Sequence, residues 1–89
     1  MLTANHAPAN RPGQSSLSIL ATMAANLKVQ ESIMKLMDLY TKQGKSISGV
    51  MIDAEVKLNS YNEAYHKMHE VLILRGFDPD EIQHYLSIG

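Results

Sequence analysis

The chain has 89 residues, a formal net charge of −1 and no cysteine. These values allow one domain, exclude a disulfide framework and a thiolate metal site, and leave no strong basic field to hold nucleic acid. The hydrophobic fraction of 45% is ordinary for a folded domain. The uncharged stretch at residues 14–27 is too short and too polar to span a bilayer. Because residues 1–16 lack the features of a secretory signal, we expect a cytoplasmic protein, with export without a cleaved signal left open.

Residues 1–15 contain Pro8, Pro12 and Gly13 and have little to bury, so we expect a flexible N-terminal tail. A first helix is predicted over residues 16–43, since no glycine or proline interrupts this stretch. A serine at position 15 or 16 is expected to cap its start. Gly44 is placed to end the helix in a left-handed conformation.

A second helix is predicted over residues 46–75, ending before Gly76. Its apolar positions alternate in steps of four and three, the heptad pattern of a coiled-coil seam. The seam consists of Ile47, Met51, Ala54, Leu58, Tyr61, Tyr65, Met68 and Leu72. Its central members, Leu58 to Met68, are expected to be buried against a stripe on the first helix. That stripe consists of Met23, Leu27, Ile33, Met34 and Met37.

A short third helix is predicted over residues 79–87. Asp78 suits the N-cap, Pro79 the first turn, and Glu81 the third helical position of a capping box. Phe77 and Ile82 have the spacing of a hydrophobic staple. The predicted fold is all-α: an antiparallel two-helix hairpin with a short C-terminal third helix, within one domain at residues 16–89.

The first helix has more apolar surface than one neighbour can cover. Its apolar arc spans roughly 240–260°, whereas one packing face needs a stripe only somewhat wider than about 100°. Exposed apolar surface of this extent is typical of an interface. We therefore expect self-association that completes a helical bundle, most simply as a homodimer, or binding to a helical protein partner. The predicted interface residues are Val29, Ile33, Leu36, Leu39 and Tyr40.

No residue pattern predicts catalysis. Glu63 and His66 have the spacing used in di-iron bundles, but the first helix offers no second pair and no histidine. Gly44, Lys45 and Ser46 resemble the end of a phosphate loop, yet Leu39 stands where its first glycine belongs. The expectation is a protein without enzymatic activity, catalytic residues, bound metal, cofactor or small-molecule substrate.

The layout resembles small helical-hairpin proteins of bacterial secretion systems, including secreted substrates with a Trp-x-Gly turn and type III needle subunits. The resemblance is one of layout. The turn reads Lys42-Gln43-Gly44 without tryptophan, and no proline lies in it. The acidic residue expected four positions after a tyrosine is also absent. The resemblance implies a helix pair that acts through other helices, and no family is assigned from it.

The predicted function is therefore that of a non-enzymatic protein–protein interaction module, such as a small helical adaptor, chaperone or assembly subunit. A place in a bacterial secretion or effector system is implied only by the resemblance in layout. The alternative is a dimeric regulator that binds nucleic acid through a lysine stripe on the first helix. That stripe consists of Lys28, Lys35, Lys42 and Lys45, and Glu31 and Asp38 interrupt it.

Overall fold

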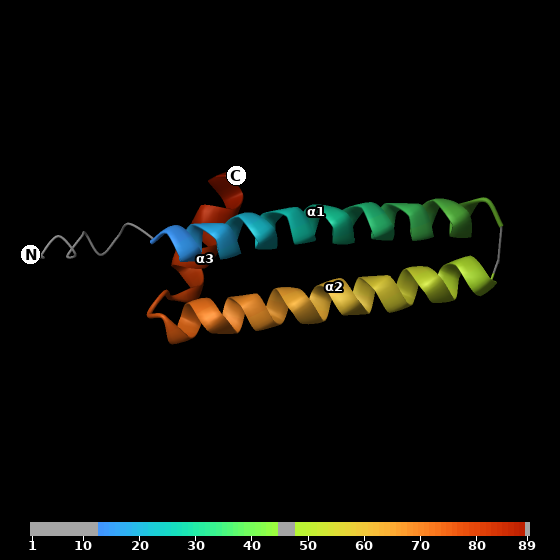
Figure 1. The fold of residues 1–89 in the computed structure, drawn as a ribbon. Helices are drawn as coiled ribbons and strands as arrows, with labels where there is room; N and C mark the ends of the chain where they lie inside the picture. The colour runs from blue at the N-terminus through green and yellow to red at the C-terminus, as the bar shows by residue number, and fades with distance from the viewer. Residues whose placement is uncertain (1–12, 45–47, 89) are drawn as a thin grey trace, which may run out of the picture.

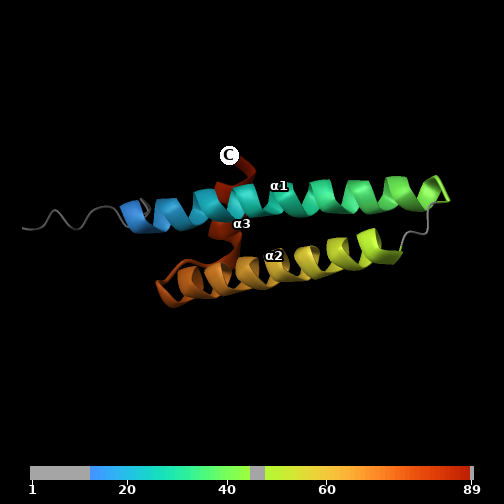
Figure 2. The same ribbon diagram turned by 45° about the vertical axis from the view of Figure 1, so that its right-hand side comes forward.

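The computed structural model describes residues 13–44 and 48–88. Within these ranges the chain forms three helices and no strand: α1 (Gln14–Lys42), α2 (Ser48–Leu74) and α3 (Pro79–Ile88) (Figure 1). The all-α prediction is confirmed for this part of the chain. The helices α1 and α2 lie side by side and run in opposite directions, and α3 crosses them where α1 begins and α2 ends (Figures 1 and 2). The predicted tail lies almost wholly outside the described residues, as do residues 45–47 between α1 and α2.

The start of α1 differs from the prediction. The helix begins two residues early, its N-cap is Gly13, and no side chain forms a capping hydrogen bond there. The prediction that Ser15 or Ser16 caps the helix is wrong. Both hydroxyls instead accept hydrogen bonds from Nη1 of Arg75, at 2.8 and 2.9 Å. Because Arg75 directly follows α2, these bonds tie the first turn of α1 to the end of α2.

The helix ends follow the predicted local rules. Gly44 and Gly76 have φ values of 69° and 99°, the left-handed region that glycine adopts without strain. The Gly76 N–H donates to the Ile73 carbonyl and the Phe77 N–H to the Leu72 carbonyl, the paired bonds of a Schellman motif. This motif ends α2 and turns the chain toward α3.

The capping box of α3 is also confirmed. Oδ1 of Asp78 accepts the N–H groups of Asp80 at 2.8 Å and Glu81 at 3.2 Å, and Oε1 of Glu81 accepts the Asp78 N–H at 3.0 Å. These reciprocal bonds satisfy N–H groups that have no partner within the helix.

Replacement of Asp78 by alanine should lower the free energy of unfolding by about 0.5–2 kcal/mol, because the first-turn N–H groups lose their acceptor. Urea unfolding followed by circular dichroism measures this loss. Asp78→Asn is the matched control, since asparagine caps nearly as well and should retain most of the stability. Equal midpoints for Asp78→Ala and the native chain would show that this cap contributes nothing.

The buried core lies where all three helices meet. Leu20 and Met23 of α1, Leu72 of α2 and Ile82 of α3 are its buried apolar residues. Six partly buried side chains pack around them. One is Phe77, the first member of the predicted staple, and the others are Ile19, Tyr65, Met68, Tyr85 and Leu86. The helix α3 therefore completes a core at one end of the helix pair, and the other end has no third helix among the described residues.

The predicted seam of α2 is buried only in part. Tyr61 is exposed, so its predicted burial is wrong, and Ile47 lies outside the described residues. Leu72 is fully buried. The remaining members are half-buried: Met51, Ala54, Leu58, Tyr65 and Met68.

The predicted stripe of α1 is wrong at two positions. Leu27 and Met34 are exposed, whereas Met23 is buried and Ile33 and Met37 are half-buried. From Met23 onward, the residues that face inward along α1 recur in steps of three and four, and two of them carry amide side chains. They are Met23, Asn26, Gln30, Ile33, Met37 and Tyr40.

A buried polar layer explains this rotation of α1. Asn26 and Gln30 are 6% and 8% exposed. Nδ2 of Asn26 donates to the backbone carbonyl of Tyr61 at 2.9 Å, and Nε2 of Gln30 donates to Oδ1 of Asn26 at 2.6 Å. Among the described residues, no buried side-chain nitrogen or oxygen lacks a hydrogen-bond partner. The layer fixes Asn26 of α1 beside Tyr61 of α2 at low cost, because its polar atoms are paired.

Candidate functional site

The described surface is rich in large apolar side chains. Four apolar residues are buried in the core, whereas fourteen large ones are exposed. Their abundance favours a surface that meets another molecule. The exposed set is Leu17, Leu27, Val29, Met34, Leu36, Leu39, Val50, Ile52, Val56, Tyr61, Val71, Ile73, Leu74 and Ile88.

Part of this surface forms a groove of about 280 Å³ between α1 and α2, which we call the distal groove. Its position in the sequence, residues 33–57, places it away from the core that α3 completes. Two charged residues, Asp53 and Lys57, lie among its lining side chains. The other lining residues are Ile33, Leu36, Met37 and Tyr40 of α1 and Val50, Met51 and Ala54 of α2.

The structure divides the five predicted interface residues. Ile33, Leu36 and Tyr40 line the distal groove, and two of these, Ile33 and Tyr40, are half-buried toward α2. Val29 and Leu39 are exposed but do not line it. The contrast is sharpest for two leucines on the same helix: Leu36 is 54% exposed in the groove, and Leu39 is 49% exposed outside it.

The predicted interface lies on α1 alone and leaves out the residues of α2 that line the distal groove. The sequence held no direct signal for them, because the register of the helix pair is set by a contact that only the structure shows. Because Asn26 lies beside Tyr61, counting outward in antiparallel order places Ile33 near Ala54 and Met37 near Val50. All four of these residues line the distal groove.

A second, shallower depression extends the groove surface along α2. It has a volume of about 390 Å³ and shares Lys57 with the distal groove. Its other lining residues are Val56, Ser60, Tyr61 and Ala64. Exposed apolar surface therefore continues on both sides of Lys57 along the helix.

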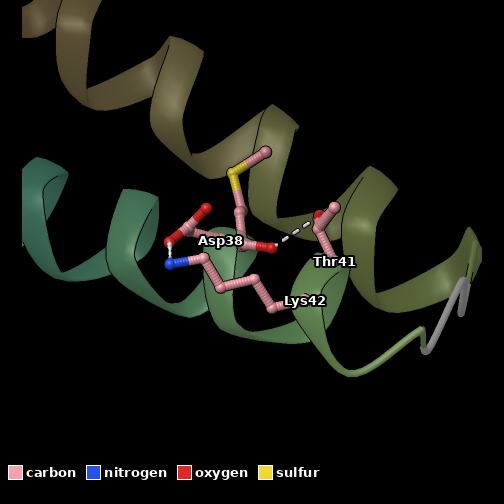
Figure 3. Close-up of polar contacts among 4 residues, drawn as sticks. Asp38, Thr41 and Lys42 are labelled. Carbon is pink, nitrogen blue, oxygen red and sulfur yellow. Dashed lines mark hydrogen bonds and ion pairs between the residues drawn. The ribbon is translucent and has the colours of Figure 1, made fainter.

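The last turns of α1 carry a solvated charge pair rather than a site. Nζ of Lys42 lies 3.1 Å from Oδ2 of Asp38, and both side chains are largely exposed (Figure 3). The Thr41 hydroxyl donates to the Met37 carbonyl at 2.9 Å (Figure 3). This Asp38–Lys42 pair contributes little stability, because water screens it. Through this pair, Lys42 of the predicted lysine stripe is already bound to a carboxylate.

The histidines of α2 lie beside carboxylates on one shallow surface depression. Its lining includes Glu63, His66, His69 and Glu70. The ring of Tyr65 lies near both imidazoles, with centroid distances of 5.7 Å to His66 and 6.3 Å to His69. In the described ranges, no three His, Cys, Asp or Glu residues are grouped so that they could hold a metal ion.

Comparisons of the chain with protein-family models, curated proteins and solved structures find no match. No helix in residues 13–44 and 48–88 is long and apolar enough to cross a membrane.

The distal groove is the candidate site, because it joins exposed apolar side chains from two helices in one concave surface.

Proposed function

We propose that this chain is a non-enzymatic interaction module that binds a helical protein segment along the distal groove. The observation that carries the proposal is the apolar lining of this groove, at the end of the helix pair that α3 does not cover. An amphipathic helix laid in an apolar groove is a recurring mode of protein recognition. Met37 and Met51 in the lining suit such a contact, since methionine adapts its shape to the surface it meets.

In this proposed function, α1 and α2 form a helical hairpin that a further helix completes to a bundle. At one end α3 already supplies apolar side chains to the gap between the long helices. An incoming helix would do the same at the distal groove and remove Leu36 and Val50 from water. A small adaptor, chaperone or assembly subunit acts in this way. Its placement in the cytoplasm, and in a bacterial secretion or effector system, belongs to the same proposal.

The alternative function, a dimeric nucleic-acid-binding regulator, has weaker support. Such a protein needs a basic face that contacts successive phosphates. Lys42 is paired with Asp38 on that face of α1. A salt-dependent shift of duplex DNA in a gel, lost when Lys28, Lys35 and Lys42 are reversed to glutamate, would favour the regulator instead.

A photo-crosslinking side chain placed at position 36 should capture protein several times more efficiently than one placed at position 39. The two leucines are similarly exposed on the same helix, so their difference reports the groove. The measurement is the yield of crosslinked protein bands in cells, whether the captured protein is this chain or another. Val50→Asp, on the opposite wall of the groove, should suppress capture from position 36, because a buried carboxylate is costly. Equal yields at the two positions would contradict the proposed function.

A further inference from the structure

We propose that the occupant of the distal groove is a second copy of this chain, held by two reciprocal ion pairs between Asp53 of each copy and Lys57 of the other. This inference rests on the proposed function and names its partner. It is carried by the charge pattern of the groove and by the distribution of apolar side chains on either side of that pattern.

The groove carries one acidic and one basic side chain, so its charge pattern is complementary to that of a second copy of the chain. Asp53 and Lys57 are the charged residues in its lining, one of each sign, and both are exposed. Neither forms an ion pair within the described part of the chain. They lie one helical turn apart, about 6 Å along α2. A two-fold axis between them would place Asp53 of each copy beside Lys57 of the other, so each charge would gain one partner and the contact would contain two ion pairs.

The same axis also matches apolar surface to apolar surface. Two antiparallel copies of α2 that cross near Glu55 bring Val50 of one copy next to Ser60 and Tyr61 of the other. Val50 lines the distal groove, and Tyr61 lines the depression that continues it beyond Lys57. Both side chains are exposed in the isolated chain. Each would be covered by its counterpart, and the contact would produce an antiparallel bundle of four long helices.

A foreign partner would need an acidic and a basic group in the matching order, flanked by apolar residues on both sides. The chain itself already presents this arrangement. The reciprocal pairing also sets the register of the two copies, because sliding by one turn would place like charges side by side.

The test uses charge reversal in the full-length chain, with sedimentation velocity over micromolar concentrations. The native chain should form dimers. Asp53→Lys and Lys57→Asp should each weaken dimerisation at least tenfold, because each puts two like-charge contacts into the homodimer. An equimolar mixture of these two variants should form heterodimers, and the double variant Asp53→Lys/Lys57→Asp should again form homodimers.

The matched control is Glu55→Lys, which makes the same change of charge two residues away, outside both groove linings. It should dimerise like the native chain, and circular dichroism should show equal helicity for all variants. Failure of the mixture to form heterodimers, while the native chain dimerises, would overturn the reciprocal pairing. A native chain that stays monomeric, but from which position 36 captures another protein, would overturn the second copy and leave the proposed function standing. A monomer without capture at position 36 would overturn both.

Discussion

Leu72→Ala should lower the free energy of unfolding by about 2–5 kcal/mol, the cost of truncating a fully buried leucine. Leu72 has no exposed surface and packs with Leu20, Met23 and Ile82, so its removal opens a cavity where all three helices meet. Small domains are commonly stable by about 5–15 kcal/mol, and this loss is a large part of that. We expect the variant to be partly unfolded near body temperature.

The matched control for this prediction is Leu74→Ala, two residues away on the same helix. Leu74 is 83% exposed, so its truncation should change stability by no more than about 0.5 kcal/mol. Leu58→Ala should cost an intermediate amount, because Leu58 is only half-buried. Urea unfolding at one fixed protein concentration measures all three, since association would otherwise shift the midpoints. Similar losses for Leu72→Ala and Leu74→Ala would show that the assigned core is wrong.

Asn26→Ala should lower the free energy of unfolding by about 1–3 kcal/mol, because it leaves the buried Gln30 amide without the acceptor it bonds. The loss comes from two contacts, the bond to the Tyr61 carbonyl and the bond from Nε2 of Gln30. The double variant Asn26→Leu/Gln30→Leu should be as stable as the native chain or more stable. Replacing both partners removes the unpaired group and adds apolar contacts.

A double-mutant cycle with Asn26→Ala and Gln30→Ala measures the coupling of the two amides. We expect an interaction free energy of about 0.5–3 kcal/mol, as found for residues in one hydrogen-bond network. Strictly additive losses would show that the layer does not act as a unit. The leucine pair should also relax the register between α1 and α2, since a buried polar residue in a helix seam specifies alignment. More than one set of amide resonances in its NMR spectrum would report that relaxation.

The sequence alone determined where α3 begins and where α1 and α2 end. These features depend on interactions within a few residues: glycine tolerates the positive φ values at positions 44 and 76, and the carboxylate of Asp78 reaches N–H groups two and three residues away. Most of the seam of α2 was also readable, because its apolar positions recur at heptad spacing, although Tyr61 at its centre is exposed.

Only the tertiary structure decided which side of α1 faces α2. The apolar arc of α1 is so wide that several rotations bury similar apolar surface, and Leu27 is a more obvious core residue than its neighbour Asn26. The choice depends on the bond from Asn26 to the Tyr61 carbonyl and on its pairing with Gln30, and the first of these exists only once the two helices are placed. The distal groove has the same origin. Leu36 and Val50 are far apart in sequence, and the antiparallel register brings them into one surface.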